Sequence, residues 1–439
     1  MKPKLFRTNL RPPVRVPRSQ SRSRPRPKTS IPFVSDVKNL HLPRDAVGLF
    51  RDYRDSGFVH EYPSYSSLVY RLLRSRSYGL VDDVLRFLKE NDVRCKETLF
   101  VALIEHYGKA GPVERALGVF HEMKDFNTVP SLQSLNALLN ALVDNGRLSD
   151  ADGMLRESRA MGFRPNSISF NVIMKGWLKL GKWETANRVF DEMLEKGVQP
   201  TVVTYNSMLG YLCRKGNMVE ALELFDDMIK KGRRANAVTY ALLMEGYCLA
   251  GRYNEARKLM FDMEYRGCKP KTVNYGVLMN DLAKRGEIDQ ARSLLNEMRK
   301  RKVKPDVVMY NILITYLCKQ MKAVEAYRIL LDMQVEGCVP NAATYRMLLD
   351  GFCTIRDFEG GLKVLNAMLI GKHCPRVETF HCLVVGLLSD GNLDGACFVI
   401  EEMEKREIGT REVWENVVSC HHGDGHGHEL LFELVSAAQ

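Results

Sequence analysis

A period of 35 residues constrains this chain more than any other feature of its sequence. The stretch Val202–Asn236 (VVTYNSMLGYLCRKGNMVEALELFDDMIKKGRRAN) has copies of itself on both sides. An aromatic position returns as Tyr205, Tyr240, Tyr275, Tyr310 and Tyr345, and a small one as Ala221, Ala256, Ala291 and Ala326. A fixed period of about 20 to 50 residues is the signature of stacked structural repeats. Each repeat then buries its apolar faces only against its neighbours.

Ten full repeats follow one another without an insertion. They occupy residues 62–96, 97–131, 132–166, 167–201, 202–236, 237–271, 272–306, 307–341, 342–376 and 377–411. The segment Pro43–Glu61 matches only the second half of a repeat, so we expect a single N-terminal capping helix there. Residues 412–439 follow as a short C-terminal helix or tail. The repeats at both ends depart most from the pattern, as is common where one face of a stack meets water.

Each repeat is predicted to form two helices. In repeat 202–236, apolar residues recur at helical spacing before and after the segment Lys215–Asn217. The glycine within that break recurs as Gly111, Gly146, Gly181, Gly216, Gly251, Gly286 and Gly391, and we expect it to supply a left-handed helix cap. A second turn, which contains Gly232 in this repeat and a proline in most others, ends the second helix. The pattern therefore predicts an all-α solenoid of helix-turn-helix repeats.

The positive charge of the chain is concentrated at its beginning. The net charge is +11, but residues 1–40 contain eleven Lys or Arg and one acidic residue, whereas the rest carries 53 basic and 52 acidic residues. A leader rich in Arg, Ser and Pro with almost no acid is typical of an organelle transit peptide. We expect residues 1–40 to be such a disordered leader, with a basic nucleic-acid-binding arm as the alternative. The arginines favour a mitochondrial over a chloroplast destination.

The cysteines and the histidine-rich tail do not indicate a cofactor. Cys213, Cys248, Cys318 and Cys353 share one repeat position, which predicts packing thiols in a reducing compartment. No C-x-x-C pair occurs. The tail carries Cys420, His421, His422, Asp424, His426 and His428, but its glycine-rich spacing favours a surface turn over a metal site. We therefore expect no metal and no other cofactor. No stretch has the roughly 18 apolar residues that a membrane span needs.

The strings VVTYNSMLGYLCRKGN, AVTYALLMEGYCLAGR and KPDVVMYNILITYLCK, together with the 35-residue period, resemble the pentatricopeptide repeat family of plant organellar RNA-binding proteins. The resemblance covers residues 43 to about 411, and the unbroken 35-residue repeats resemble its plain-repeat class. Tetratricopeptide repeats, the nearest competitor, have a period of about 34 residues and a different signature. The resemblance implies a right-handed superhelix in which each repeat recognises one base of single-stranded RNA.

The resemblance also implies which side chains recognise the bases, namely the fifth and the last residue of each repeat. The base-recognising pairs expected here are Asn136 with Asn166, Asn171 with Thr201, Asn206 with Asn236, Gly276 with Asp306, and Asn311 with Asn341. Asparagine at the fifth position resembles pyrimidine-binding combinations, and the Asn/Asn pairs lean toward cytosine. Pairs such as Ala241 with Lys271 receive no base assignment. The alternative is that the fifth-position asparagines cap the first helix.

Two further series of residues recur once per repeat. The second position is aliphatic at Ile168, Val203, Val238, Val273 and Val308, and the resemblance implies that these side chains sandwich the bases. A position near the end of the first helix is basic at Arg74, Lys109, Lys179, Arg214, Lys284 and Lys319. A stripe of one cation per repeat could track phosphates. The alternative is that these cations only stabilise helix C-termini. For the aromatic Tyr205 position we expect core packing and not base stacking.

These observations favour a non-enzymatic, sequence-selective binder of single-stranded organellar RNA. It would act by occupancy in transcript stabilisation, processing, splicing or translation, as a monomer, together with other RNA-processing proteins and away from membranes. The expected target has a pyrimidine-rich core: three adjacent pyrimidines, two undefined positions and another pyrimidine. A helical scaffold for protein partners, for example on an organellar ribosome, is the alternative. No phosphate loop or nucleophile–base motif supports an enzyme.

Overall fold

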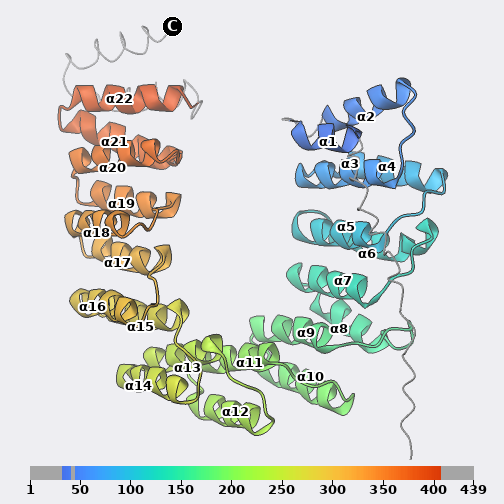
Figure 1. Cartoon of the computed structure of the whole chain (residues 1–439), viewed down its shortest axis with the longest axis horizontal. Helices are drawn as coiled ribbons and strands as arrows, with labels where there is room; N and C mark the ends of the chain where they lie inside the picture. Colours follow the sequence, from blue (N-terminus) through green and yellow to red (C-terminus); the bar gives the residue numbers. More distant parts are fainter. Residues whose placement is uncertain (1–31, 41–44, 407–439) are drawn as a thin grey trace, which may run out of the picture. The chain divides into compact units, whose positions relative to one another are not determined.

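The computed structural model describes residues 32–40 and 45–406, which fold into α-helices, one short 3-10 helix and no strand (Figure 1). The chain divides into two compact stacks, one ending at Pro165 and the other beginning at Asn166. The N-terminal stack contains α1 (Pro32–Asn39), α2 (Asp45–Asp55), α3 (Tyr62–Arg74), α4 (Tyr78–Glu90), α5 (Glu97–Ala110), α6 (Val113–Glu122), η1 (Met123–Phe126), α7 (Leu132–Asp144) and α8 (Leu148–Glu157).

The C-terminal stack contains seven helix pairs. They are α9 (Ser167–Lys179) and α10 (Trp183–Glu195), α11 (Val202–Lys215) and α12 (Met218–Lys230), α13 (Ala237–Leu249) and α14 (Tyr253–Tyr265), α15 (Thr272–Lys284) and α16 (Ile288–Lys300), α17 (Val307–Lys319) and α18 (Ala323–Val335), α19 (Ala342–Thr354) and α20 (Phe358–Ile370), and α21 (Val377–Ser389) and α22 (Leu393–Glu404). The predicted all-α array of stacked helix pairs is confirmed.

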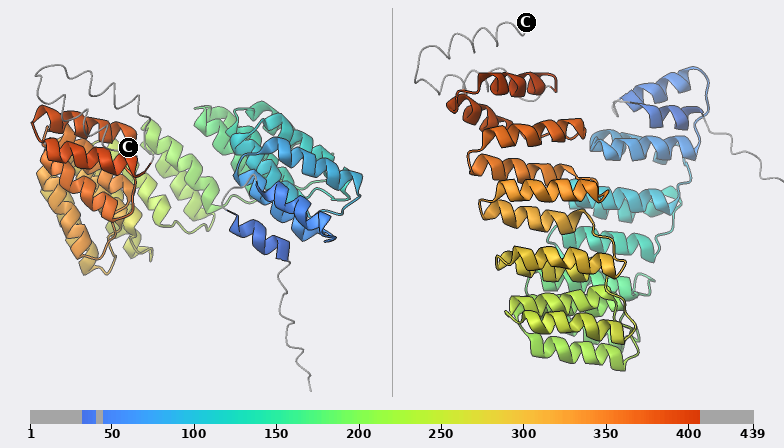
Figure 2. Two further views of the ribbon diagram at one scale, coloured as in Figure 1. Left: turned by 90° about the horizontal axis from the view of Figure 1, so that it is seen from above. Right: turned by 60° about the vertical axis from the view of Figure 1, so that its left-hand side comes forward.

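Each stack has two layers of helices. The first helix of a repeat packs on its own second helix and on the first helix of the next repeat, as in the series α11, α13, α15, α17 and α19 (Figure 2). The first helices therefore form one continuous layer within each stack, and the second helices form the other. Any residue type that recurs on the exposed side of a first helix is repeated along this layer.

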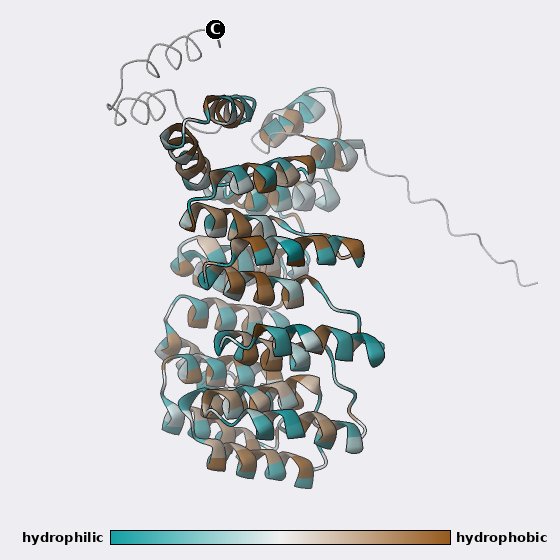
Figure 3. Cartoon of the chain, turned by 90° about the vertical axis from the view of Figure 1, so that its left-hand side faces the viewer, coloured by the Kyte–Doolittle hydropathy of each residue, from teal (hydrophilic) through white to brown (hydrophobic). Residues whose placement is uncertain are grey.

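The recurring apolar residues fill the space between the helices. The tyrosines of the fourth repeat position are buried from Tyr205 to Tyr345, and the alanines of the Ala221 position have no exposed surface. Figure 3 shows apolar and polar residues interspersed along the helices of the array. The prediction that the Tyr205 position packs in the core is confirmed, since a buried ring offers no face to a base.

One helix lies where the sequence predicted only a disordered leader, so that prediction is wrong for residues 32–39. Helix α1 contacts α3, and it buries Phe33 and Val37, which lie four residues apart on one helical face. The Phe33 ring lies edge-on to Phe50 and Tyr53 of α2, with centroids 5.6 and 5.4 Å away. Helix α2 lies within the segment expected to form a single capping helix, but α1 precedes it and both helices contact α3. Residues 1–31, 41–44 and the tail from residue 407 lie outside the described residues.

Left-handed turns join the two helices of most repeats. Gly146, Gly181, Gly216, Gly251, Gly286 and Gly391 all have positive φ, as predicted. Gly111 does not: its φ is −123° because Pro112 follows and disfavours helical geometry in the preceding residue. At the same repeat position Arg76, Met321 and Arg356 adopt positive φ despite their side chains.

Several cysteines contribute to the close packing between repeats. A Cβ atom built on Gly246 would lie 3.0 Å from Sγ of Cys213, and one on Gly351 would lie 2.5 Å from Sγ of Cys318. Burial raises the pKa of both Cys213 and Cys318 to about 12. All cysteines in the described part of the chain are free thiols.

None of the helices that the structure describes is long and apolar enough to cross a bilayer.

Candidate nucleic-acid interface

The last residue of a repeat is the N-cap of the next first helix. Oδ1 of Asn236 accepts hydrogen bonds from the backbone N–H groups of Val238 and Thr239, both at 3.0 Å. The same arrangement recurs in the C-terminal stack at Asn166, Thr201, Asp306 and Asn341. Helix capping is therefore a role of the last position. The capping alternative proposed for the fifth position is wrong, because Asn171, Asn206 and Asn311 are each the fifth residue of a helix and not the residue before it.

The fifth-position asparagines instead accept a hydrogen bond from the following repeat. Oδ1 of Asn171 accepts from Oγ1 of Thr204 at 2.8 Å. Asn206 and Thr239 form the same bond, as do Asn311 and Thr344, each at 2.8 Å. Within the described residues, Nδ2 of these three asparagines has no hydrogen-bond partner. Each amide therefore keeps both donor hydrogens free, while its oxygen already accepts one hydrogen bond from the buried hydroxyl.

The structure brings three of the predicted base-recognising pairs together. Thr239 Oγ1 lies 2.8 Å from Oδ1 of Asn206 and 3.2 Å from Oδ1 of Asn236. Thr204 and Thr344 bridge the pairs Asn171 with Thr201 and Asn311 with Asn341 in the same way. The fifth and last residues of these repeats are thus neighbours, although they lie 30 residues apart in sequence.

The remaining two pairs differ. Gly276 has no side chain to donate or accept, and a Cβ atom there would lie 2.9 Å from Cε of Met309. Asp306 caps α17 through Oδ1, leaving Oδ2 as the only polar atom of that pair. Asn136 belongs to the N-terminal stack and Asn166 to the C-terminal stack. Asn136 and Asn171 are each only 8% exposed, so little more than the edge of the amide reaches the surface.

The second-position aliphatic residues are exposed in every repeat where they were predicted to contact bases. Ile168, Val203, Val238, Val273 and Val308 are 41–58% exposed. Each precedes its fifth-position residue by three, so both lie on one side of the first helix. Large apolar side chains that are exposed at the same position of successive helices indicate a ligand-binding surface. Apolar residues exposed without a role would be scattered over the molecule.

The predicted phosphate-binding residues are exposed and carry no ion pair. Arg74, Lys109, Lys179, Arg214, Lys284 and Lys319 all lie in the last turn of a first helix. Among the residues the structure describes, none of these six forms a salt bridge, whereas Arg115, Arg147, Arg285 and Arg301 each form two. At helix C-termini these cations also interact favourably with the helix macrodipole. Their location therefore agrees both with phosphate binding and with a role in stabilising the helix ends.

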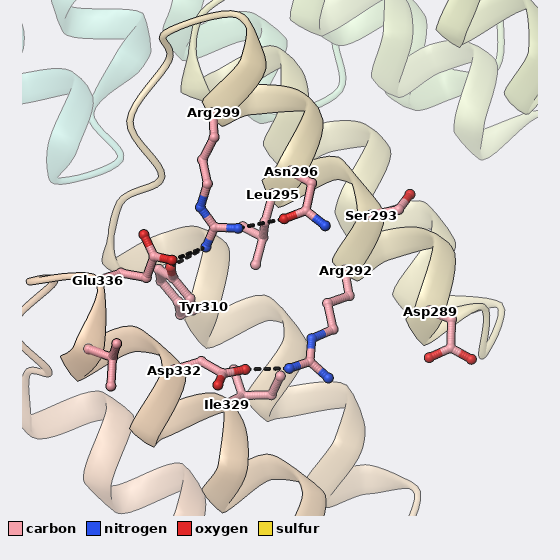
Figure 4. Close-up of a pocket in the computed structure, with 11 residues that line it drawn as sticks. Asp289, Arg292, Ser293, Leu295, Asn296, Arg299, Tyr310, Ile329, Asp332 and Glu336 are labelled. Atoms are coloured by element: carbon pink, nitrogen blue, oxygen red, sulfur yellow. Dashed lines mark hydrogen bonds and ion pairs between the residues drawn. The ribbon is translucent and has the colours of Figure 1, made fainter.

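A cavity of about 400 Å³ lies in the other layer, between α16 and α18 (Figure 4). Its basic groups are already paired: Arg292 contacts Asp332, and Arg299 contacts Glu336. Arg299 also donates to the hydroxyl of Tyr310 at 3.3 Å. This pairing between neighbouring second helices holds the repeats together, and it leaves no unpaired arginine for an anion.

The threonines that bond to the fifth-position asparagines were missed by the sequence analysis. A signal for them exists, because Asn136, Asn171, Asn206 and Asn311 are each followed 33 residues later by a hydroxyl residue. These residues are Ser169, Thr204, Thr239 and Thr344. The pattern joins one repeat to the next and is invisible when each repeat is considered alone.

Comparisons with known proteins agree with this architecture. A model described as PPR repeat family matches residues 165–209, 200–249, 235–283, 270–308 and 305–354, and one described as PPR repeat matches residues 98–128, 134–163, 343–370 and 378–408. The chain is 54% identical over 126 residues to a mitochondrial pentatricopeptide repeat-containing protein of Arabidopsis thaliana, covering 29% of this chain and 28% of that protein. A second mitochondrial relative from Arabidopsis is 32% identical over 123 residues, covering 28% and 23%. The matched stretches span about a quarter of these curated relatives.

Solved structures with a similar fold include PPR10 in complex with an 18-nt psaJ RNA element, at 18% identity and a TM-score of 0.42, covering 86% of this chain and 69% of that chain. Yeast Rmd9p in complex with a 16-nt target RNA is similar at 14% identity and a TM-score of 0.44, covering 90% of both chains. The family models together match most of the repeat array from residue 98 to residue 408, and the chain belongs to the pentatricopeptide repeat family.

Proposed function

We propose that this chain binds single-stranded RNA sequence-selectively and acts by occupying its site, without catalysis. One recurring arrangement carries the proposal. Repeats 167–201, 202–236 and 307–341 each place an exposed aliphatic residue, a donor amide and an unpaired cation on the first helix. An apolar surface, a polar edge and a positive charge are what a nucleotide's base plane, base edge and phosphate require.

The hydrogen-bond pattern fits a pyrimidine base, and the choice of pyrimidine over purine rests on the family resemblance. With Oδ1 of Asn206 and of Asn236 both engaged, this repeat offers Nδ2 donors to a base. Pyrimidines present the acceptor O2, and cytosine adds N3 as a second acceptor on the same edge. On the family resemblance we assign pyrimidines to repeats 132–166, 167–201, 202–236 and 307–341, with cytosine favoured by the Asn/Asn pairs. Two unassigned positions separate the last pyrimidine from the first three.

The relatives and the leader support a mitochondrial site of action. Three of the similar Arabidopsis proteins are mitochondrial by name. The basic, acid-poor leader of this chain fits import into the same organelle. We place the protein on mitochondrial transcripts, where a bound solenoid would block nucleases or keep a site unpaired for processing, splicing or translation.

Binding of the full chain to two RNA oligonucleotides of about 12 residues tests this proposal. One carries the pyrimidine pattern above, and the other has purines at the same four positions. We expect tighter binding of the first, with a strong dependence on salt. Equal binding of both at low salt, with none at physiological salt, would show that sequence is not recognised.

A scaffold for protein partners is the second candidate, and the second-helix layer favours it. Tyr265 of α14 and Val335 of α18 are 94% and 87% exposed, and Phe261 is also exposed on α14. Replacing Tyr265 and Val335 by serine should leave RNA binding unchanged, because both residues lie on second helices. If the same variant loses a partner protein from pull-downs of mitochondrial extract while RNA binding persists, the scaffold role gains support.

A further inference from the structure

We infer that Thr204, Thr239 and Thr344 are positioning residues that set the base preference of the preceding repeat. Each would do so by holding the asparagine amide of that repeat with its Nδ2 group toward the RNA. The inference rests on the proposed function, and it concerns residues outside the fifth and last positions. It starts from three equal contacts: each threonine Oγ1 lies 2.8 Å from Oδ1 of an asparagine 33 residues earlier.

The surroundings of each hydroxyl determine how it bonds. All three threonines are fully buried, so water does not compete for the bond. Oγ1 of Thr239 already accepts from the backbone N–H of Asn236 at 3.2 Å, and Oγ1 of Thr344 accepts from Asn341 in the same way. The hydroxyl proton is then available for an acceptor, and the closer one is Oδ1 of the fifth-position asparagine, at 2.8 Å against 3.1–3.2 Å for the cap residue.

This bond selects one of two orientations of the amide. An asparagine side chain can exchange its oxygen and nitrogen by rotating half a turn about its last torsion. With Oδ1 turned to the buried threonine, Nδ2 takes the opposite side, and the amide can only donate to a ligand. Without the hydroxyl, both orientations become accessible, and the same residue could present an acceptor instead.

Repeats without a fifth-position asparagine lack this hydroxyl–amide bond. Asn274, which follows Ala241, donates through Nδ2 to the carbonyl oxygen of Ala237 at 2.9 Å. Met309, which follows Gly276, occupies the space beside that glycine. Ser134, which follows Val101, forms the capping box with Ser131 and also interacts with the Glu97 side chain. An interrepeat hydroxyl–amide bond therefore accompanies the asparagine in all three repeats where the structure describes both partners within one stack.

Thr239→Val removes the hydroxyl while keeping the shape of the side chain, and Thr239→Ser restores it. Binding of the full chain is measured to RNAs with each of the four bases at every position of the target. We expect Thr239→Val to reduce discrimination at one nucleotide by about three- to tenfold, while Thr239→Ser retains it. Thr344→Val should act at a nucleotide three positions away, because each repeat recognises one base.

Thr379→Val is the matched control, because Thr379 follows Arg346 and not an asparagine. Unchanged discrimination in both Thr239→Val and Thr344→Val would overturn the positioning role alone. An equal loss of affinity for all RNAs, with a lowered melting temperature, would overturn it too and leave a structural role. A wild-type chain without any base preference would instead refute the proposed function, and the positioning role with it.

Discussion

At the scale of single residues, the amide of the fifth position carries the proposed specificity. Asn171→Ala and Asn206→Ala remove a donor but leave the helix caps Asn166 and Thr201 in place. We expect pyrimidine preference at the corresponding nucleotides to weaken by about 0.5–1.5 kcal/mol, the net value of one hydrogen bond. Four-base binding measurements check this, with Asn254→Ala on the exposed side of α14 as control. A variant that unfolds while losing affinity for every RNA would point to a structural role for the amide.

The sequence alone predicted the roles of some of these residues but not of others. The 35-residue period correctly separated buried positions such as Tyr205 from exposed ones such as Val203. It could not assign the helix cap, because capping depends on where the first helical residue lies, and that boundary falls between two repeats. The bond from Thr239 to Asn206 was missed for the same reason. Contacts across a repeat boundary are not expressed as periodicity within one repeat.

At the scale of helices and turns, the turn residue with positive φ between the two helices of a repeat offers a direct test of what determines stability. Arg356 has a φ of 58°, a conformation that costs an L-residue roughly 1–2 kcal/mol, and its side chain is exposed. Arg356→Gly should stabilise the C-terminal stack by about 0.5–1 kcal/mol after the greater flexibility of glycine in the unfolded chain is subtracted. Gly216→Ala should destabilise it by about 1 kcal/mol, since no atom crowds the new Cβ and only φ is strained. Thermal unfolding of both variants measures this, and a lower melting temperature for Arg356→Gly contradicts it.

The N-terminal helices provide a prediction about pH. Burial lowers the pKa of His60, whose Nε2 donates to the carbonyl oxygen of Phe50 and whose ring stacks on the Phe50 ring with centroids 3.8 Å apart. Its Nδ1 is buried without a partner, so a second proton there would have no acceptor. The pKa of His60 in the folded protein lies below its unfolded value of about 6.5. The stabilisation that buried, neutral His60 gives the folded state is therefore complete above about pH 6.5. It is lost as the pH falls from there through the lower folded pKa.

His60→Gln keeps a donor for the Phe50 carbonyl but cannot titrate. The free energy of unfolding of the N-terminal stack should therefore decrease from pH 7 to pH 5 in the wild type, and decrease less in the variant. Hydrogen exchange of the backbone amides of α2 and α3 measures this difference. Identical pH dependence in the two proteins would place the titrating group elsewhere.

The aromatic contacts of the N-terminal helices also explain why the sequence did not predict α1. Its formation depends on packing Phe33 against residues of α2, and not on any periodicity of the leader.

At the scale of the whole molecule, the proposed function depends on the summed charge of one stripe. The chain outside residues 1–40 is nearly neutral, so RNA affinity cannot come from net charge. It must come from where unpaired cations lie, and Lys179, Arg214 and Lys284 occupy the same position on α9, α11 and α15 without ion pairs in the described structure. Each phosphate neutralised on a single strand contributes about −0.7 to the slope of log affinity against log salt concentration.

Replacing Lys179, Arg214 and Lys284 together by alanine should therefore make this slope less steep by about 2, the sum expected for three phosphates. Base discrimination should persist, because the amides and aliphatic residues of the first helices remain. Lys258→Ala, on the exposed side of α14 in the other layer, should leave the slope unchanged. An unchanged slope in the triple variant would mean that these three cations serve only as helix C-terminal charges. The affinity of the array would then have to come from its exposed valines and amides alone.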